Sequence, residues 1–448
     1  MEVTAEKSAP AANGNSADEW FERFASGLDE PDFLVAKRRE AWARCAQLPM
    51  PTRKTEEWRY TDVSGFTPES FETIPPTEDM VAFEDLPVEV RDVIEHSHER
   101  AGIFVQRNGA AIHMRLDSDL ETRGVVLAPI SEVARERPEL LEKYLYRDDV
   151  TEMEEKLWTL HAAMLTGGYL LYVPENTKIE HPVHAFRYVD RAGSLVATHS
   201  LIVADPGSEV TCIDEYISPD LEGTATSLAG VEIIGEAGAD VHYVSLQRYG
   251  RGIQHFSIQH VTAARDTRIN GFNVTLGADL TRSDVSSRLN GPGAEGIMLA
   301  LWFGDRDQHI DHHTLQDHAA PHAHSDLLYK GALTDSARSV FRGLIRVMPG
   351  AQLTDAYQTN RNLLLSKDAS ATALPNLEIA ADDVRCSHGA TIGQVEERQM
   401  FYLMSRGLSK QQAERLLVLG FFDEVLGKLT VEGVRTRVRA AIGRKLGV

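Results

Sequence analysis

Turns that recur at multiples of about 28 residues constrain this chain more than any other feature of its sequence. Helical periodicity disappears at Gly168 and stays absent for more than 200 residues, where short apolar or alternating runs follow one another. The gaps between the turn glycines are 31, 55 and 57 residues, or roughly one, two and two repeats. The turns are Pro206-Gly207, Gly238-Ala239, Gly293-Ala294 and Pro349-Gly350. Each of the two longer gaps should contain one more turn, and the residues near Arg265-Asp266 and Pro321-His322 have the character of turns.

The runs between these turns have the character of strands. Phe272, Val274 and Leu276 alternate with Asn273 and Thr275, which is the period of a half-buried strand. Strand pairs that recur at one spacing predict a stacked β-helix, in which each coil buries its inner face on its neighbours. A sandwich or barrel also contains many short strands, and the pattern alone does not exclude either.

Helical patterns flank the repetitive region. We divide the chain into a disordered tail (1–15), an N-terminal helical region (16–167), the β-helix core (168–392) and a C-terminal helical region (393–448). A capping box of Ser16 and Glu19 predicts the first helix, and further helices are expected at 32–47, 130–145 and 150–164. In the C-terminal region, apolar residues from Val395 to Met404 should pack one helix that Gly407 ends. Ser409 and Gln412 form a second capping box.

Composition excludes several classes of protein. No apolar run reaches the roughly 18 residues that span a bilayer, and the N-terminus lacks the pattern of a signal peptide. We therefore expect a cytoplasmic protein that does not bind membranes. The net charge of -21 also argues against nucleic acid as a partner. With 11 Lys against 35 Arg, the surface resembles that of a salt-adapted protein, although an ordinary acidic cytosolic protein fits equally well.

Cys386 and His388, in the run Arg385-Cys386-Ser387-His388-Gly389, are the strongest local signal for chemistry. On one strand, residues two apart point to the same face, roughly 7 Å from each other. A thiolate and an imidazole together suit iron, zinc or an iron–sulfur cluster. Two ligands do not close a site, so a partner chain would have to complete it. The alternative is a buried cysteine beside a hydrogen-bonded histidine.

Two other motifs need an interpretation. Six histidines lie between His309 and His324 without the acidic residue of a His-Glu-x-x-His helix, and we expect them to face solvent or a partner rather than bind metal. Gly291 to Gly296 spells G-x-G-x-x-G, but the pattern of Ile297 to Phe303 predicts a strand where a nucleotide site needs a helix. We interpret it as a β-helix turn. The sequence also lacks a Gly-Lys-Ser/Thr loop for ATP.

Several blocks, in order, resemble the SufD family of SUF-system iron–sulfur cluster assembly proteins. The signature is LPNLEIAADDVRCSHGATIGQ, Leu374 to Gln394. The other blocks are PTRKTEEWRYTDV (Pro51 to Val63), HAAPHAHSDLLYKGAL (His318 to Leu333), AQLTDAYQTNRNLLLS (Ala351 to Ser366), Met400 to Gly407 and Gly420 to Glu424. Two positions depart from the family pattern, because Leu344 and Leu353 stand where lysine is usual.

The resemblance implies a right-handed parallel β-helix between two helical regions. It implies a non-enzymatic scaffold that pairs with the paralogue SufB and docks the ATPase SufC on helices at about 395–448. It also implies that His388 helps to hold a transient iron–sulfur cluster at the SufB interface, with Cys386 as a second candidate ligand. We expect no cofactor in the isolated chain, and a homodimer in the absence of SufB is left open.

Two alternatives belong to other classes. One is a β-helix enzyme that acts on polysaccharide, which would need a groove of carboxylates and aromatic platforms. The other is a metal-storage or sensor protein built on the histidines from His309 to His324.

Overall fold

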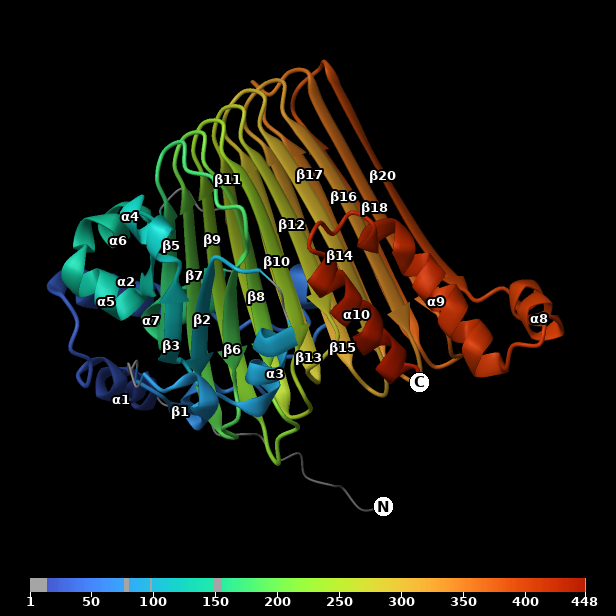
Figure 1. Ribbon diagram of the computed structural model, residues 1–448, viewed down its shortest axis with the longest axis horizontal. Coiled ribbons are helices and arrows are strands. Elements are labelled where there is room, and N and C mark those ends of the chain that lie inside the picture. The colour runs from blue at the N-terminus through green and yellow to red at the C-terminus, as the bar shows by residue number, and fades with distance from the viewer. Residues whose placement is uncertain (1–13, 76–79, 97–98, 148–154, 448) are drawn as a thin grey trace.

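The computed structural model describes residues 14–75, 80–96, 99–147 and 155–447. The expected mainly β fold is confirmed, with 42% of residues in strands and 27% in helices. The core is a parallel β-solenoid of about eight turns with helices at both ends (Figure 1). Among the described residues, no helix combines the length and apolar character needed to cross a membrane.

The chain alternates between two sheets as it winds. Sheet A contains β5 (Gly167–Val173), β7 (Ser194–Ala204), β9 (Ala225–Gly235), β11 (Ile253–Ala263), β13 (Leu280–Leu289), β15 (His309–His318), β17 (Arg338–Val347) and β19 (Ser370–Ile379), stacked in that order. Sheet B contains β6 (Val183–Tyr188), β8 (Glu209–Ile217), β10 (Asp240–Arg248), β12 (Arg268–Thr275), β14 (Glu295–Gly304), β16 (His324–Leu333), β18 (Thr354–Leu364) and β20 (Val384–Gln394). Neighbouring strands of this series are parallel, so each coil pairs only with the coils before and after it.

One edge of the solenoid carries a ladder of stacked turn residues with positive φ. Each residue of the ladder donates its backbone N–H to a carbonyl of the next coil, as in Gly238 N to Arg265 O at 2.9 Å. The ladder runs through Asn176, Gly207, Gly238, Asp266, Gly293, His322 and Leu353. The turns expected from Gly207 to His322 are confirmed, including that of the G-x-G-x-x-G run. The turn expected at Pro349-Gly350 is also present, but the ladder residue of that connection is Leu353 and not Gly350.

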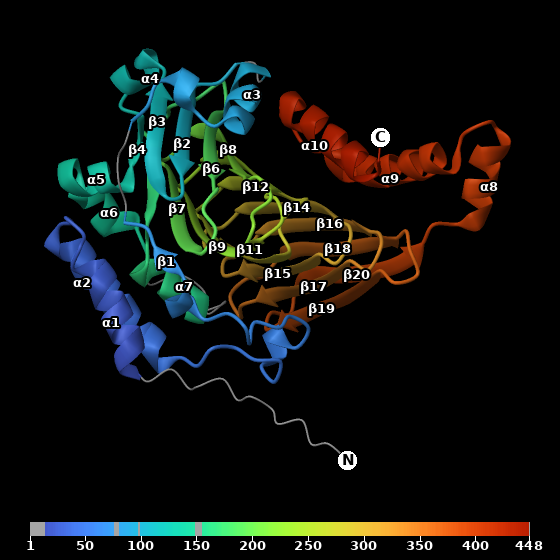
Figure 2. The same cartoon turned by 90° about the horizontal axis from the view of Figure 1, so that it is seen from below.

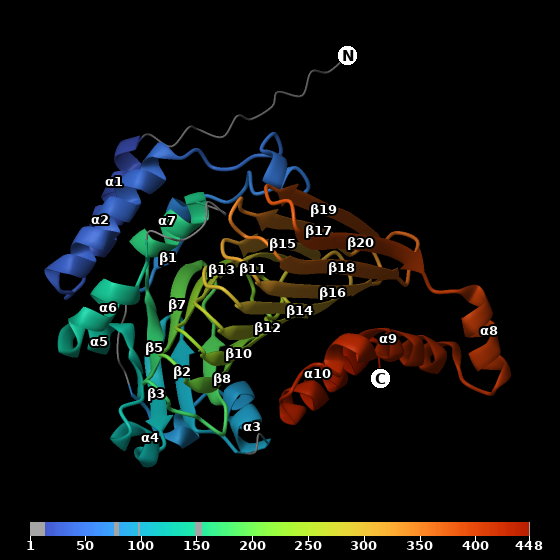
Figure 3. The ribbon, with the colours of Figure 1, turned by 90° about the horizontal axis from the view of Figure 1, so that it is seen from above.

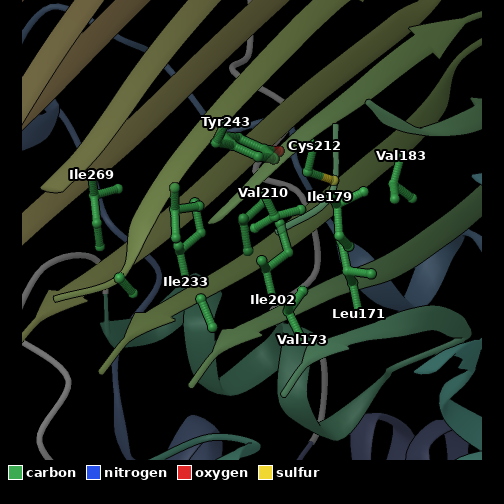
Figure 4. Close-up of a cluster of buried hydrophobic side chains, with 14 of the residues drawn as sticks. Leu171, Val173, Ile179, Val183, Ile202, Val210, Cys212, Ile233, Tyr243 and Ile269 are labelled. Carbon is green, nitrogen blue, oxygen red and sulfur yellow. The ribbon is translucent and has the colours of Figure 1, made fainter. Parts of the chain in front are cut away.

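The interior of the solenoid is apolar in its first coils and increasingly polar further on. Leu171, Val173, Ile202, Val210 and Ile233 point toward one another in the apolar part (Figure 4). In β12, by contrast, Asn273 points inward and accepts a hydrogen bond from Gln259 at 2.9 Å. Phe272, Val274 and Leu276 point outward and pack against C-terminal helices. The half-buried strand expected here is therefore buried on both faces.

The N-terminal region adds strands as well as helices. Its helices are α1 (Gly14–Ala25), α2 (Asp32–Gln47), α3 (Val88–His96), α4 (Ser118–Thr122), α5 (Ile130–Glu136), α6 (Pro138–Tyr144) and α7 (Glu155–Ala163), with short 3-10 turns η1 (Glu56–Trp58), η2 (Pro68–Ser70) and η3 (Phe83–Asp85). β1 (Glu72–Thr73) pairs with β7, β2 (Gly102–Arg107) and antiparallel β3 (Ala110–Leu116) extend sheet B, and β4 (Val126–Pro129) extends sheet A. Between the end strands β3 and β4, helix α4 packs Leu120 into the interior and closes this end of the solenoid. The region 16–167 is therefore not wholly helical.

The expected N-terminal helices are present, with two corrections. The helix expected at 130–145 is divided at Arg137, before Pro138, into α5 and α6. Helix α7 lies within the range 150–164, of which 150–154 are outside the described residues. The helix predicted at 32–47 matches α2. Helix α1 begins at Gly14, so Ser16 lies inside the helix and not at its N-cap. The expected disordered tail overlaps residues 1–13, which lie outside the described residues.

A segment around η1 crosses the outer face of sheet A (Figure 2). Trp58 is buried there with the Arg282 guanidinium 3.8 Å from its ring centroid, and Thr61 donates to Asp311 at 2.5 Å. Arg282 also pairs with Asp284 at 2.9 Å. The block Pro51 to Val63 thus holds the N-terminal region on the core through a buried cation–π contact and a hydrogen bond.

The C-terminal helices cover the outer face of sheet B. They are α8 (Glu397–Ser405), α9 (Lys410–Leu426) and α10 (Glu432–Lys445). Helices α9 and α10 lie along the sheet while α8 projects past β20 (Figure 3). Ser409 and Gln412 form the predicted capping box, and α8 ends before Gly407. The predicted packing of α8 is wrong, because none of its residues is buried.

Candidate metal centre at the open end of the β-helix

The last two strands leave one end of the β-helix open. β19 pairs with β17, and β20 pairs with β18, and within the described residues neither has a neighbour on its other side. Both strands expose much of their surface, including Ile379 at 42% and Ile392 at 46%. Free strand edges are sites where another chain can add. The signature block Leu374 to Gln394 forms this end of the molecule.

Cys386 and His388 lie on β20 and share the face that continues the interior of the solenoid. Cys386 is in register with Ala356, and His388 is in register with Gln358 on β18. The Cys386 side chain packs beside Ala356, Leu377 and Val384, so this face points inward. The predicted common face is thereby confirmed. Whether either residue binds a metal stays a prediction.

The two side chains differ in environment. Cys386 is half-buried, whereas His388 is exposed. Burial, assisted by the negative charge of Asp355, raises the pKa of the Cys386 thiol. The thiol is therefore protonated at neutral pH, and a metal would have to displace the proton before the sulfur could bind. The alternative of a buried, hydrogen-bonded histidine does not describe His388.

The described part of the chain does not complete a metal site by itself. It contains no group of three or more His, Cys, Asp or Glu side chains arranged to hold a metal ion. As ligands, Cys386 and His388 would make up only two of the four that a tetrahedral iron or zinc site uses. The remaining ligands would have to come from another molecule.

The histidines from His309 to His324 are dispersed by the fold. His312 and His318 face the interior, where His318 lies 2.8 Å from the Ser325 hydroxyl and His312 packs on Trp302 with ring centroids 4.8 Å apart. His313 points the other way and meets Asp311 at 3.0 Å. The expectation that these histidines face solvent or a partner is wrong for these three, because β15 is covered on both sides. His322 occupies an exposed turn.

A second feature, which the sequence pattern did not reveal, is an apolar surface on α8 and α9. Phe401 is 73% exposed and Tyr402 57%, and Met404 and Leu416 are also exposed. A groove of about 400 Å³ runs between the two helices. Its lining residues are Arg398, Gln399, Tyr402, Leu403, Leu416 and Leu417. Exposed aromatic residues of this kind commonly mark binding surfaces.

These observations first define a class. The chain is a β-helical protein that is covered by α4 at one end and carries a cysteine and a histidine on one face of its last strand at the other. It also has an apolar surface on α8 and α9.

Comparisons with known proteins identify the family. Residues 186–421 match the model "SUF system FeS cluster assembly, SufBD core domain", and residues 21–185 match "SufBD protein N-terminal region". The chain is 33% identical over 432 residues to the iron–sulfur cluster assembly protein SufD of Bacillus subtilis, which covers 96% of this chain and 97% of that one. It is 28% identical to a SufBD family protein of Synechocystis, over 92% and 91% of the two chains. The chain belongs to the SufBD family of iron–sulfur cluster assembly proteins and is SufD-like.

Membership of this family decides between the alternatives. It assigns the β-helix to iron–sulfur cluster assembly, so nothing now favours an enzyme acting on polysaccharide. The dispersal of the histidines from His309 to His324 also removes the basis for a metal-storage site in that segment.

Proposed function

We propose that this chain is a cytoplasmic, non-enzymatic scaffold subunit that pairs with SufB through its open end and docks the ATPase SufC on its C-terminal helices. A transient iron–sulfur cluster forms at the interface with SufB, held in part by His388 and with Cys386 as a second ligand. SufC hydrolyses ATP, and the hydrolysis changes how the paired β-helices sit against one another. The chain itself makes or breaks no covalent bond in this scheme.

The open end of the β-helix is the observation that supports pairing with SufB. β19 and β20 each expose a strand edge, and the two candidate ligands lie beside those edges. Covering the edges with a second β-helix would satisfy their backbone groups and bring further ligands to Cys386 and His388. A paralogue with the same fold has the required shape. Pairing with a second copy of this chain uses the same surface.

The surface on α8 and α9 supports the docking of SufC. Phe401 and Tyr402 leave large apolar areas in water, and α8 stands clear of the core. Because α9 is fixed to sheet B by buried Val418 and Phe422, a pull on α8 would be transmitted to the β-helix. This connection is what coupling to ATP hydrolysis requires.

The pairing is tested by placing charges on the open end. We expect the double substitution Ile379→Lys and Ile392→Lys to abolish co-purification of SufB, since lysines on an edge strand oppose its extension. Val88→Lys is the matched control, because Val88 is 51% exposed on α3, in the N-terminal region. Undiminished SufB binding by the double variant would contradict the proposed interface. The melting temperature of each variant checks that the chain is folded.

A further inference from the structure

In the described part of the chain, Gln358 is one of several buried polar residues of the interior whose polar atoms are unpaired. It lies on β18 with its side chain in the interior of the solenoid and is 0% exposed. Neither its amide oxygen nor its amide nitrogen has a hydrogen-bond partner among the described residues. Leaving a buried polar group without a partner costs about 1–3 kcal/mol. The amide of Gln358 therefore keeps both its donor and its acceptor free for a group that comes next to it.

The opposite wall of the interior leaves room for this amide. Gly343 on β17 faces it, and a Cβ atom at position 343 would lie 2.5 Å from the amide atoms of Gln358. A larger residue at 343 would push the amide aside. The space around the amide is therefore set by both sheets.

His388 lies next to Gln358 and itself lacks a partner. The two residues are in register on neighbouring parallel strands, and they point to the same face. Such strands are about 4.8 Å apart, a distance that a glutamine side chain can bridge. Within the described residues the His388 imidazole makes no hydrogen bond and is exposed. Histidines that bind metals almost always donate their second ring N–H to a nearby acceptor, which fixes the ring and its tautomer.

A series of hydrogen bonds between polar side chains begins beside Gln358 and leads back into the interior. The Gln316 amide donates to the backbone oxygen of Tyr357 at 3.1 Å and to the Ser325 hydroxyl at 2.7 Å. Ser325 is in turn 2.8 Å from His318. These hydrogen bonds hold the backbone of Tyr357, the residue before Gln358, and so limit the movement of the Gln358 side chain.

We propose that Gln358 is the positioning residue for His388. When a partner covers the open end, the amide oxygen of Gln358 accepts a hydrogen bond from the ring N–H of His388. That bond leaves the other ring nitrogen unprotonated and aimed at the metal. The inference rests on the proposed function, because it requires His388 to be a ligand.

The test replaces the amide by an apolar group of similar shape in the SufB-containing complex. Gln358→Met should leave the melting temperature of the isolated chain unchanged or slightly higher, because the lost amide had no partner there. In the loaded complex the same variant should weaken iron retention against a chelator by about 10- to 100-fold. Pulsed EPR of the reduced cluster should show an altered quadrupole coupling of the remote imidazole nitrogen, which reports the hydrogen bond of that nitrogen.

Three further variants separate the explanations. Gln358→Glu keeps an acceptor oxygen and should restore iron retention toward that of the unmodified chain. Asn360→Leu removes a polar group from the same face of β18, but beside Ala390 and not beside His388, and should leave the nitrogen coupling unchanged. His388→Ala should abolish iron retention.

The outcomes distinguish the two proposals. If His388→Ala abolishes retention while Gln358→Met changes neither retention nor the nitrogen coupling, Gln358 has no positioning role and the ligand proposal survives. If Gln358→Met lowers the melting temperature of the isolated chain and leaves the coupling unchanged, its role is structural. If His388→Ala retains iron normally, both proposals fail.

Discussion

His388 differs from His312, His313 and His318 in being exposed to solvent. The three buried histidines are fixed by neighbouring side chains, as His313 is by Asp311 at 3.0 Å. His388 has no such support, so its imidazole contributes little to the packing of the isolated chain. A role in binding accounts for its presence better than a role in stability.

This difference predicts the effect of His388→Ala. The free energy of unfolding should change by about 1 kcal/mol or less, because no cavity forms and no partner is left unpaired. Cluster formation in the complex should fall sharply, since Ala offers no nitrogen donor. Melting temperature and iron–sulfur absorbance measure the two effects. Cys386→Ser should have a similar or milder effect on absorbance, and a destabilised His388→Ala chain that assembles clusters normally would rule out the ligand role.

At the scale of elements, the turn ladder sets the spacing of the coils. Six of its seven residues are Asn, Gly, Asp or His, which tolerate the positive φ that the stacked turns require. Leu353, with φ 60° and 49% of its surface exposed, is the exception. A leucine in this conformation costs about 1–2 kcal/mol.

Leu353→Asn should therefore stabilise the chain by about 1 kcal/mol. Asparagine adopts positive φ readily, and little packing is lost because the leucine is half exposed. Urea denaturation measures the change. Met348→Asn removes another exposed apolar side chain, 40% exposed and without positive φ, and should give no such gain. A loss of stability in Leu353→Asn would show that the leucine packs in solution.

The three C-terminal helices fall into two groups, because α9 and α10 pack on sheet B whereas α8 projects from it. A stacked core does not in general depend on terminal helices, but α9 and α10 cover the outward-facing Phe272, Leu301 and Phe303 of sheet B. Deleting residues 395–448 should thus expose an apolar face and lower the urea midpoint. It is an unsuitable test of SufC docking, because lost binding would also follow from misfolding.

Phe401→Asp provides the suitable test. The ring is 73% exposed, so the melting temperature should change little. If the proposed dock is correct, SufC binding should fall at least tenfold, because a carboxylate replaces an apolar anchor. Val88→Asp is the control on a distant exposed apolar residue. Surface plasmon resonance with SufC measures both, and equal affinities would contradict docking on α8.

At the scale of the whole molecule, the two terminal regions clamp opposite faces of the β-helix. The outer face of sheet A holds Arg282, Asp284 and Asp311, and sheet B holds Glu215 between Arg248, at 2.9 Å, and Arg437 of α10, at 3.0 Å. Burial alone would raise the pKa of the Glu215 carboxyl, but the hydrogen bond to His184 and the two arginines hold it well below its usual range. Strands β19 and β20 at the open end take no part in these ionic contacts.

Buried neutral histidines give this fold a strong pH dependence. Burial lowers the pKa of His255 to about 3 and those of His260, His312 and His318 to about 4, against 6.5 in the unfolded chain. The unfolded state binds these protons first, so the stabilisation is present above pH 6.5 and is lost as the pH falls toward 4. Each histidine should contribute a slope of about 1.4 kcal/mol per pH unit in that window.

Urea denaturation between pH 4.5 and 7.5 measures this dependence. His255→Gln removes one of the four groups and should lower the slope by about 1.4 kcal/mol per pH unit. A stability that is flat across this range would show that the four histidines have the same pKa in the folded chain as in the unfolded chain.

The positions of the repeats could be predicted from the sequence, but which face of each strand points into the interior could not. Turn positions from Gly207 to His322 follow from glycine and aspartate, and the common face of Cys386 and His388 follows from their spacing. Leu353 has no turn signature, so its place in the ladder was missed. The direction of β12 was also not predictable, because both of its faces are buried and hydropathy does not say which faces inward. Asn108-Gly109, both with positive φ, was a readable signal for the β2–β3 hairpin.

The two ends of the β-helix are also made at different times during translation. The strands β2, β3 and β4 that close one end leave the ribosome before any complete coil, and each later coil emerges beside a finished one. β20 is the last strand to be made. A nascent chain therefore shows an extendable edge throughout translation but acquires Cys386 and His388 only when the final coil is complete. Truncated chains would end in an edge without Cys386 and His388, so under the proposed function only a chain with a complete β-helix could hold a cluster.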